Sequence, residues 1–454
     1  MRGRGCHAQG GHRAPDQGRD PGSRRSARRH RSLAGHQPVL LGRQSVTRLL
    51  LLLPTSTYRT EDFVDAATTL GVDLVCASEK PSTFERSVPD HLLTLDFSDP
   101  GAAAETAATF AARRPLDAVV GVDDLTAVTA AAIAERLGLR ANVVAAVSAA
   151  RDKFQMRQCL RAAGVRVPRF RRIALKDDPF LAARGVAFPC VLKPLALSAS
   201  RGVIRADTID QFMAAFRRIS ALLARDDVAV TGDAAQFLLA EEYIPGIEVA
   251  LEGLLVDGAL QTLALFDKPD PLVGPFFEET LYVTPSRLPA EVQQAIVRTT
   301  ADACAALGLR EGPVHAELRV NEAGPWILEV AARSIGGLCS RTLRFGTGMT
   351  LEEVILRQAL GLPIASLERE GQAAGVMMLP IPRAGTLRAV HGVDDAKGVE
   401  GIEDVAITVH VGQALEPLPE GRQYLGFIFA RGARPAAVEE ALRDAQARLR
   451  VSIE

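Results

Sequence analysis

The chain has 454 residues, of which 47% are hydrophobic and 24% charged; this composition is close to a soluble globular average, and the length predicts about two to four domains. The formal net charge of −1 hides an asymmetry, because residues 1–48 carry eleven Arg and two Asp while the remainder carries 42 basic and 52 acidic residues. The acidic body offers no broad basic face for nucleic acid, no apolar run reaches the ~20 residues of a membrane span, and the six cysteines form no Cys-x-x-Cys pair.

Residues 1–46 are rich in Arg, Gly and His and show no hydrophobic period, so we expect them to be disordered. Such a start can mimic an organelle transit peptide, although its Gly and Pro disfavour the amphipathic helix that transit peptides need. Nucleic-acid binding is a second interpretation. We favour a third, in which the gene start is over-extended and the natural protein begins near Val46. Peptide mapping of the natural N-terminus distinguishes the three.

The first structured region, residues 47–150, alternates short apolar runs with helical patterns. We expect strands at 48–54, 72–78, 92–97 and 116–123, and helices at 61–70, 101–113 and 125–137. This alternation predicts an N-terminal open parallel α/β domain. The region lacks the G-x-G-x-x-G fingerprint of a dinucleotide site.

From residue 151 the pattern changes to an α+β arrangement. We expect helices at 152–163, 210–223 and 290–307, strands at 186–194 and 237–244, a hairpin of 248–256 with 259–266, and a long acidic, Pro-rich functional loop at 267–285. After residue 362 the pattern predicts a small C-terminal α+β domain, with strands near 374–380, 405–411 and 425–430 and a helix at 436–449.

A second hairpin carries two acidic residues. Strands at 313–320 and 326–330 flank a five-residue turn, and symmetric closure puts Glu317 opposite Glu329. Opposed carboxylates repel unless a cation such as Mg²⁺ neutralises them. Alternation places further residues on these faces: His315 and Arg319 beside Glu317, Ile327 and Ala331 beside Glu329, and then Arg333. An exposed face with ordinary charges is the alternative, because a one-residue change in the turn would separate the two Glu.

Two lysines and a small-residue turn suggest a grip on phosphate. Lys193 ends an apolar strand, where a charge is costly unless it is paired. The turn at 198–203, with Ser200 and Gly202, offers backbone N–H groups and hydroxyls to a nucleotide phosphate. Lys153 begins a helix, and taken alone it reads more simply as a surface lysine.

The strand at 237–244 ends in a further acidic group. A free strand edge at its end could bond a purine through the backbone, while Glu248 could accept hydrogen bonds from ribose hydroxyls. An ordinary acidic edge strand is the alternative. The strand-end residues are Glu241, Glu242, Tyr243 and Ile244.

The order of these motifs resembles the ATP-grasp superfamily of carboxylate–amine ligases. The sequence VLKP around Lys193, the small turn, the strand end at Glu241, His-Ala-Glu at Glu317 and ILEVAAR from 327 to 333 follow one another as in that superfamily. Residues 314–344 are similar to the bacterial L-amino-acid ligase (dipeptide synthase) branch, and MMLP at 377–380 is similar to its small closing domain. The resemblance covers about residues 47–454.

The resemblance implies a pre-ATP-grasp domain over 47–150, a two-lobed ATP-grasp domain over 151–362 and a closing domain over 363–454. It implies ATP between the lobes and Mg²⁺, or Mn²⁺, at the two opposed Glu. Residue roles follow from it: Lys153 and Lys193 contact ATP, Glu241 and the backbone to Ile244 recognise adenine, Glu248 binds ribose, Glu317 and Glu329 hold the metal, and Arg333 steadies the transferring phosphoryl group and the acyl intermediate.

Two positions depart from the family pattern. Many members have Asn two residues after the second metal Glu, whereas this chain has Ala331, so a third protein ligand to the metal is missing. The phosphate loop of the family is usually Gly-rich, but the turn at 198–203 holds one glycine, Gly202.

We therefore expect an ATP-dependent ligase that joins a carboxylate, an L-amino acid, to the amine of a second amino acid through an acyl-phosphate. The loops 267–285 and 333–341 would line the substrate pocket, where Glu278 could meet an ammonium group and Gly336 and Gly337 could leave room for a side chain or bind a carboxylate. His315 lies on the same face as Glu317.

Two other functions remain open: carboxylation through carboxyphosphate, as in biotin carboxylases, and a nucleotide-binding regulator without turnover. We expect small-molecule substrates, a homodimer as a possible assembly, and neither nucleic acid nor membrane as a partner. The scattered cysteines suit a reducing, cytoplasmic location.

Overall fold

The computed structural model describes residues 47–228, 230 and 232–454, so the expectations for residues 1–46 lie outside the described residues. The N-terminal region forms the predicted parallel sheet, in the order β3-β2-β1-β4. Its elements are β1 (Arg48–Leu52), α1 (Thr60–Leu70), β2 (Asp73–Ser78), β3 (Leu92–Thr94), α2 (Pro100–Ala111), β4 (Ala118–Gly121) and α3 (Asp124–Leu137).

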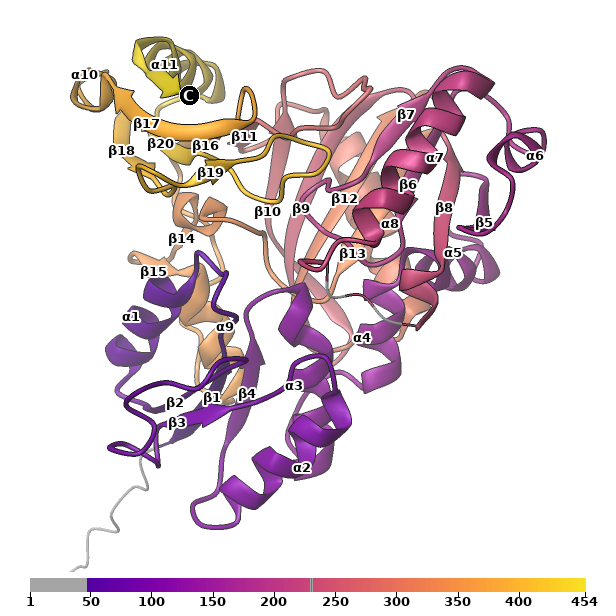
Figure 1. The fold of residues 1–454 in the computed structure, drawn as a ribbon. Helices are drawn as coiled ribbons and strands as arrows, with labels where there is room; N and C mark the ends of the chain where they lie inside the picture. The colour runs from indigo at the N-terminus through magenta and orange to yellow at the C-terminus, as the bar shows by residue number, and fades with distance from the viewer. Residues whose placement is uncertain (1–46, 229, 231) are drawn as a thin grey trace, which may run out of the picture. The chain divides into compact units, whose positions relative to one another are not determined.

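The run of leucines in β1 is buried because both faces of this sheet are covered, as is usual for a parallel sheet. Leu49 and Leu51 belong to a core cluster with residues of α1 and of α9 (Leu351–Ala359), a helix from much later in the chain (Figure 1). Leu50 and Leu52 pack instead against α2 and α3. One apolar strand therefore ties the N-terminal region to a helix that follows the core.

The first lobe of the core is an antiparallel sheet in the order β5-β8-β6-β7. In α7, the side chains of Phe212, Phe216, Ile219 and Leu222 are buried at helical spacing and pack on this sheet. The elements of the lobe are β5 (Phe170–Ala174), α6 (Pro179–Ala183), β6 (Cys190–Pro194), β7 (Ile204–Ala206), α7 (Ile209–Leu223) and β8 (Phe237–Glu242).

The second sheet has eight strands, in the order β13-β12-β9-β10-β11-β16-β20-β18, and every pairing is antiparallel. It continues across the expected domain boundary at residue 362, because β16, β18 and β20 come from the C-terminal region. The strands are β9 (Ile247–Val256), β10 (Ala259–Lys268), β11 (Leu281–Thr284), β12 (Gly312–Asn321), β13 (Gly324–Ala331), β16 (Ala373–Leu379), β18 (Ile402–Ile407) and β20 (Gly426–Gly432).

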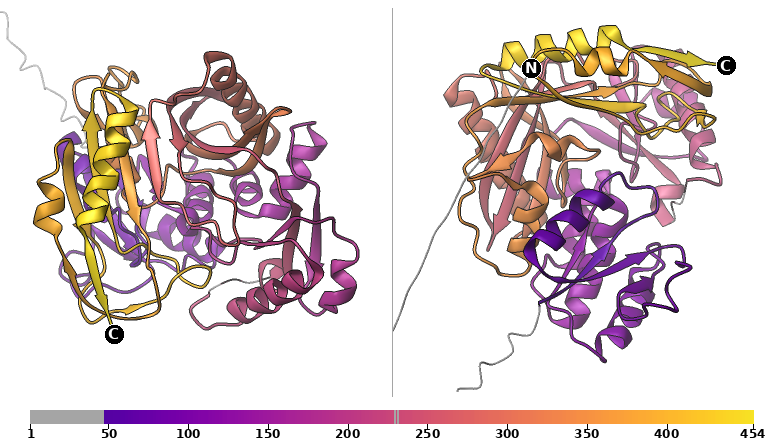
Figure 2. Two further views of the ribbon diagram at one scale, coloured as in Figure 1. Left: turned by 90° about the horizontal axis from the view of Figure 1, so that it is seen from above. Right: turned by 90° about the vertical axis from the view of Figure 1, so that its left-hand side faces the viewer.

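Helices pack on this large sheet in two groups. α4 (Val144–Arg151), α5 (Lys153–Ala162) and α8 (Ala290–Leu307) share a core cluster with β9, β12 and β13. α11 (Pro435–Arg448) covers β16 and β20 at the C-terminal end of the sheet (Figure 2). Smaller elements complete the C-terminal region: β14 (Arg344–Phe345), β15 (Met349–Thr350), β17 (Gly385–His391), α10 (Val393–Lys397), β19 (Ala414–Leu415) and β21 (Arg450–Ile453).

The structure corrects several sequence-based expectations. The loop expected at 267–285 ends in β11, which pairs with both β10 and β16. The strand expected near 405–411 is β18 at Ile402–Ile407. The elements β5, β7, α4 and α9 were not predicted. Among the residues that the structure describes, no helix is long and apolar enough to cross a membrane, and five cysteines are free.

Candidate active site

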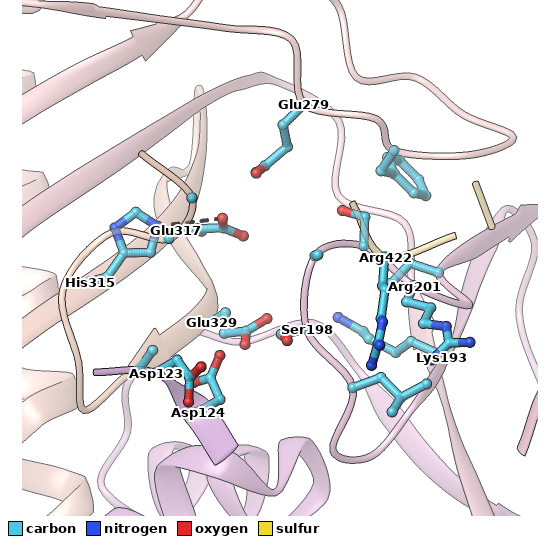
Figure 3. A pocket seen from close by; sticks show the side chains of 18 of the residues that line it. Asp123, Asp124, Lys193, Ser198, Arg201, Glu279, His315, Glu317, Glu329 and Arg422 are labelled. Atoms are coloured by element: carbon cyan, nitrogen blue, oxygen red, sulfur yellow. Dashed lines mark ion pairs between the residues drawn. The ribbon is translucent and has the colours of Figure 1, made fainter. Parts of the chain in front are cut away.

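A cavity of about 700 Å³ is lined by residues of the N-terminal region, both lobes of the core and the C-terminal region. Figure 3 shows His315 and Glu317 on one side, Lys193, Arg201 and Arg422 on the other, and Glu329 between them. The described lining carries nine carboxylates against eight Lys and Arg side chains. A polyanionic nucleotide in this cavity would therefore need added positive charge.

Glu317 and Glu329 are directly paired across β12 and β13, as predicted. The turn, however, is shorter than expected, because Val320 pairs with Pro325 and the ladder closes at Asn321 and Gly324. A β-bulge at Leu328 then adds one residue and restores the pairing of the two Glu.

Because of this bulge, the prediction that Ile327 shares a face of the strand with Glu329 is wrong. Ile327 lies in the apolar core with Leu318, against which it pairs, and not beside Glu329. The carbonyl of Leu328 accepts a hydrogen bond of 2.5 Å from Nη2 of Arg157, which gives the bulge a fixed partner.

His315 connects Glu317 to a fully buried carboxylate. Its Nδ1 lies 3.1 Å from Oε2 of Glu252, and its Nε2 lies 3.6 Å from Oε1 of Glu317. Burial lowers the pKa of His315, but the two carboxylates outweigh it and raise the pKa to about 9. Glu252 also accepts the backbone N–H of Ile335 at 3.0 Å. Sequence reasoning missed Glu252, which lies between apolar residues of β9.

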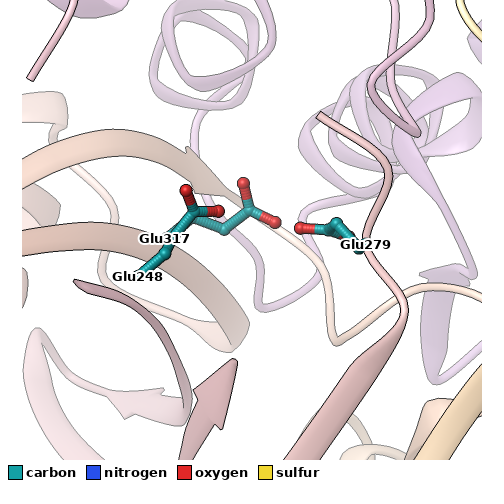
Figure 4. Close-up of side chains that lie close together, drawn as sticks. All are labelled: Glu248, Glu279 and Glu317. Atoms are coloured by element: carbon teal, nitrogen blue, oxygen red, sulfur yellow. The ribbon is translucent and has the colours of Figure 1, made fainter. Parts of the chain in front are cut away.

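A second missed group is Lys268 at the end of β10. Its ammonium contacts Glu248 at 2.9 Å, Glu317 at 3.3 Å and Glu279. Carboxylate oxygens of these three Glu lie within 4.8 Å of one another (Figure 4). The spacing could hold a cation, but the Lys268 ammonium already bonds to all three side chains. The positive charge that these three carboxylates need is therefore supplied in part by Lys268.

Glu317 and Glu279, both next to Lys268, have pKa values shifted in opposite directions. Burial raises the pKa of Glu317, but the charges of Lys268 and His315 outweigh it and hold the pKa well below its usual range. Burial and the neighbouring Glu317 raise the pKa of Glu279 to about 7. Glu317 is thus ionised, whereas Glu279 is about half protonated near pH 7.

Lys193 lies at the end of β6, as predicted, and is buried. Its ammonium lies 2.5 Å from Glu241, whose other oxygen lies 2.6 Å from Nε of Arg157. Burial lowers the pKa of Lys193. Burial alone would raise the pKa of Glu241, but Arg157 and Lys193 outweigh it and lower the pKa. The Glu241 side chain therefore neutralises two buried cations.

Lys153 is buried rather than a surface lysine. Asp152 caps the helix that Lys153 begins, and the Lys153 ammonium donates to the carbonyl of Leu197 at 2.8 Å. The same ammonium lies 3.3 Å from Glu329. Lys153 thus connects β13, which carries Glu329, to the residue that precedes the turn at 198–203.

The turn at 198–203 differs from the expectation for a phosphate loop. Ser200 lines the cavity, whereas Gly202 lies outside the described lining, and its backbone N–H donates to the carbonyl of Pro419 at 2.8 Å. Ala199 and Ser200 both have positive φ, at 56° and 54°. Such left-handed conformations cost non-glycine residues about 1–2 kcal/mol each, so contacts with the rest of the protein must stabilise the turn.

The end of β8 lines the cavity as expected, through Glu241, Glu242, Tyr243 and Ile244. Arg319 donates to the carbonyl of Ile244 at 2.8 Å, and the N–H of Ile244 has no hydrogen-bond partner within the described part of the chain. Glu248 also lines the cavity, and its oxygens contact Lys268 and, at 3.0 Å, Nε of Arg319.

Arg333 is held by the N-terminal region. Its Nε and Nη2 donate to one oxygen of Asp124 at 3.0 and 2.8 Å. Asp124 is the first residue of α3, and Asp123 caps that helix at the carboxyl end of β4. Burial raises the pKa of Asp124, but the charge of Arg333 outweighs it and lowers the pKa. Two acidic residues that follow a parallel strand were a sequence signal for this site that we missed.

The remaining substrate candidates divide into two groups. Gly336 and Gly337 line the cavity, as expected. Glu278 lies outside the described lining, and the neighbouring Glu279 faces the cavity instead. Glu278 and Glu279 are adjacent in the chain, so the predicted position was wrong by one residue. Apolar and aromatic side chains complete this part of the lining: Tyr58, Tyr282, Cys339, Met378 and Tyr424.

Family profiles match three parts of the chain. They describe an ATP-grasp N-terminal domain over residues 64–139, an ATP-grasp domain over 186–342, and the L-amino acid ligase C-terminal domain 2 over 377–454. The fold and the cavity define an ATP-grasp protein. Within that class the three matches and the relatives described below support an L-amino-acid-ligase-like assignment, in agreement with the resemblance stated from the sequence.

Individual relatives agree with this assignment. The chain is 31% identical over 277 residues to the alanine–anticapsin ligase of Bacillus subtilis, a match that covers 56% of this chain and 57% of that protein. It thus spans little more than half the length of the curated relatives it matches. The crystal structure of the L-amino acid ligase from Bacillus licheniformis superposes with a TM-score of 0.77 at 26% identity and covers 90% of this chain and 99% of that chain.

A more distant structure shares the fold alone. Carboxyaminoimidazole ribonucleotide synthase from Aspergillus clavatus, complexed with ATP, superposes with a TM-score of 0.68 at 18% identity and covers 89% of this chain and 99% of that chain. The architecture is therefore one in which solved structures hold ATP.

Proposed function

We propose that this protein is an ATP-dependent ligase that joins the carboxylate of an L-amino acid to the amine of a second amino acid. The observation that carries the proposal is one cavity in which Glu317 faces Glu329 while Arg333 and Lys193 line its walls. The similarity to the two ligases named above supports it.

The reaction would proceed in two steps. A carboxylate oxygen attacks the γ-phosphorus of ATP, and the bond between the γ-phosphorus and the bridging oxygen of the β-phosphate breaks. ADP departs, and the substrate is now an acyl-phosphate. The amine nitrogen of the second substrate then attacks the acyl carbon, and phosphate departs with the former carboxylate oxygen. The amine loses a proton as the amide forms. Charge on the phosphoryl group is the main quantity that the protein has to stabilise.

The nucleotide would lie along the end of β8 and the turn at 198–203. The free N–H of Ile244 suits an adenine nitrogen, and Lys193 and Lys153 supply positive charge toward the phosphates. Glu248 keeps its proposed role at the ribose, because a carboxylate offers about four acceptor positions and two are in use. Gly202 is omitted from this scheme, since its N–H bonds to Pro419.

A metal ion fits between the opposed Glu317 and Glu329. Paired carboxylates, the negative excess of the lining and the preference of Mg²⁺ for one or two carboxylates plus phosphates all favour this position, and Mn²⁺ could replace Mg²⁺. When bound there, the metal would neutralise charge on the ATP phosphates. Glu317 and Glu329 each lie 3.3 Å from an ammonium, that of Lys268 and that of Lys153, so the metal would share this pair with two lysines. Glu248 and Glu279 contact Lys268 more closely and are less suitable.

Arg333 and Glu279 would serve the substrates. Arg333, oriented by Asp124, would donate its remaining N–H groups to the transferring phosphoryl group and to the acyl-phosphate oxygens. Glu279 faces the cavity and takes the place proposed for Glu278, as a carboxylate that meets a substrate ammonium. The aromatic and apolar lining nearby would receive an amino-acid side chain.

ADP release, screened across pairs of L-amino acids with and without bicarbonate, tests this function. We expect release that requires a pair of amino acids, with an amide product of matching mass. Stimulation by bicarbonate alone would favour a carboxylase. ATP binding without ADP release across the screen would favour a regulator without turnover.

A further inference from the structure

A segment of the C-terminal region holds the turn at 198–203. The N–H of Gly202 donates to Pro419, and Nε of Arg201 donates to the carbonyl of Glu420 at 2.7 Å. The other end of the Arg201 guanidinium pairs with Asp227 at 2.7 Å. The Arg201 side chain is buried, whereas that of Asp227 is exposed. The turn is therefore fixed from outside by residues 416–424, which we call the C-terminal clasp.

Two ion pairs fasten the clasp to the same lobe. Glu420 bonds to Arg218 of α7, with Nη2 and Oε2 2.8 Å apart, and Glu416 takes two hydrogen bonds of 2.6 and 3.0 Å from Arg225 just beyond α7. The clasp then turns sharply at Gly421, where an added Cβ would lie 1.9 Å from the Glu416 carbonyl oxygen. Because of this turn, the next residues enter the cavity lining: Arg422, Gln423 and Tyr424.

Arg422 and Arg151 differ from the other cationic groups of the lining, because neither makes a hydrogen bond or ion pair with a residue that the structure describes. Lys193 and Arg201 each have a carboxylate partner, as do Lys153, Arg59, Arg319 and Arg333. Arg151 lies close enough to Asp124 to help lower its pKa. Arg422 makes no hydrogen bond or ion pair with any residue that the structure describes. Its guanidinium points into the cavity on the side of Lys193 and Arg201, away from His315 and Glu317 (Figure 3).

We propose that Arg422 binds the phosphate groups of the nucleotide, and that the clasp delivers this residue when it closes on the turn at 198–203. The inference rests on the proposed ATP binding. A planar guanidinium matches phosphate oxygens bidentately, and it would compensate for a loop that has one glycine whose N–H is already used. A phosphate group suits Arg422 better than the carboxylate of the second amino acid does, because Arg422 lies on the side of the cavity that carries Lys193.

Isothermal titration calorimetry of the full chain with ADP, and separately with adenosine, in the presence of Mg²⁺ tests the inference. For Arg422→Ala we expect the Kd of ADP to rise about 10- to 100-fold, the usual effect of losing a charge-assisted bond, while the Kd of adenosine stays unchanged. Arg388→Ala is the matched control, because Arg388 is an exposed arginine of the C-terminal region outside the described lining.

Two further variants separate position from charge. Arg422→Lys keeps the charge without the planar fork and should give an intermediate Kd. The double variant Glu416→Gln and Glu420→Gln leaves Arg422 in place but loosens the clasp, and it should raise the Kd of ADP less than Arg422→Ala does.

Three outcomes would overturn the inference. If wild type and Arg422→Ala bound ADP with the same Kd, Arg422 would have no role at the phosphates. If Arg422→Ala lost affinity for adenosine as much as for ADP, Arg422 would act only by keeping the site folded. A rise in the KM of an amino acid with ADP affinity unchanged would assign Arg422 to a substrate carboxylate. Failure of the wild type to bind ADP would instead overturn the proposed function, and this inference with it.

Discussion

Glu317 faces Glu329 because Leu328 is the extra residue of a β-bulge in β13. With a two-residue turn and a regular ladder, Glu317 would face Leu328 and Glu329 would point to the opposite side of the sheet. The bulge carbonyl bonds to Arg157, which also bonds to Glu241 under the nucleotide side of the cavity. One arginine thus links the strand that carries Glu329 to the strand end expected to meet adenine.

Glu329→Gln tests the opposed pair. The variant keeps the shape of the side chain but removes half of the charge proposed to hold Mg²⁺, so Mg²⁺-dependent ADP release should fall by about 100-fold or more. Circular dichroism and the Tm should stay close to wild type. Glu322→Gln, in the exposed turn of the same hairpin, is the control and should keep its activity. Unchanged activity in Glu329→Gln would remove this pair from the mechanism.

Glu241 and Glu242 are neighbours with very different predicted effects on stability. Glu241→Gln leaves the buried cations Arg157 and Lys193 without a partner and should lower the free energy of unfolding by about 3 kcal/mol or more. Glu242→Gln breaks a pair with the exposed Arg169 and should change it by less than about 1 kcal/mol. Urea denaturation measures both. Similar values for the two variants would contradict the burial of this charge cluster.

His315 should make the stability of the metal-free protein depend on pH. Its pKa is raised from 6.5 to about 9 in the folded state, so its contribution is fully present below pH 6.5 and is lost as the pH rises through 9. The contribution amounts to about 3 kcal/mol at most, from 1.36 kcal/mol per pKa unit.

Urea unfolding of wild type and His315→Gln at pH 6, 7.5 and 9.5 measures this difference. This difference should shrink toward high pH. A difference that stays constant with pH would mean that His315 acts through packing alone.

Arg333 and Asp124 should behave as one unit. Arg333→Lys keeps a charge but loses the planar fork, so kcat should fall by about 100-fold. Asp124→Asn should lower kcat by a smaller factor, because Asp124 acts by orienting Arg333. The double variant should be little worse than Arg333→Lys alone, since the partner of Asp124 is already altered. Additive losses in steady-state kinetics would mean that the two residues act separately.

The sequence predicted the parts of the fold that local pattern controls. The leucine run of β1, the Gly-capped helices of the N-terminal region and the Asp257–Gly258 turn between β9 and β10 were all found close to their expected places. Short strands were missed: β7 has three residues and β11 has four, too few for a visible alternation. Their strand character comes from pairing with distant strands, which no local window contains.

In the site, too, residues within local motifs were predicted, and residues that depend on distant partners were not. The two Glu, two Lys and Arg333 lie in one cavity, and each carries a recognisable local motif. Lys268, Glu252 and Arg157 were missed because their polar partners on other elements are 11 to 171 positions away in the chain. The pairing of Glu317 with Glu329 was predicted from a five-residue turn with a regular ladder, whereas the structure has a tighter turn and a bulge, and the two differences cancel.

The central claim is that a carboxylate oxygen attacks ATP before the amine reacts. An amino acid labelled with ¹⁸O in its carboxylate, incubated with ATP, Mg²⁺ and an acceptor amino acid, tests this claim by mass spectrometry of the released phosphate. We predict one ¹⁸O atom in each phosphate formed together with the amide. Amide formation with unlabelled phosphate, or with ¹⁸O in AMP, would contradict the acyl-phosphate.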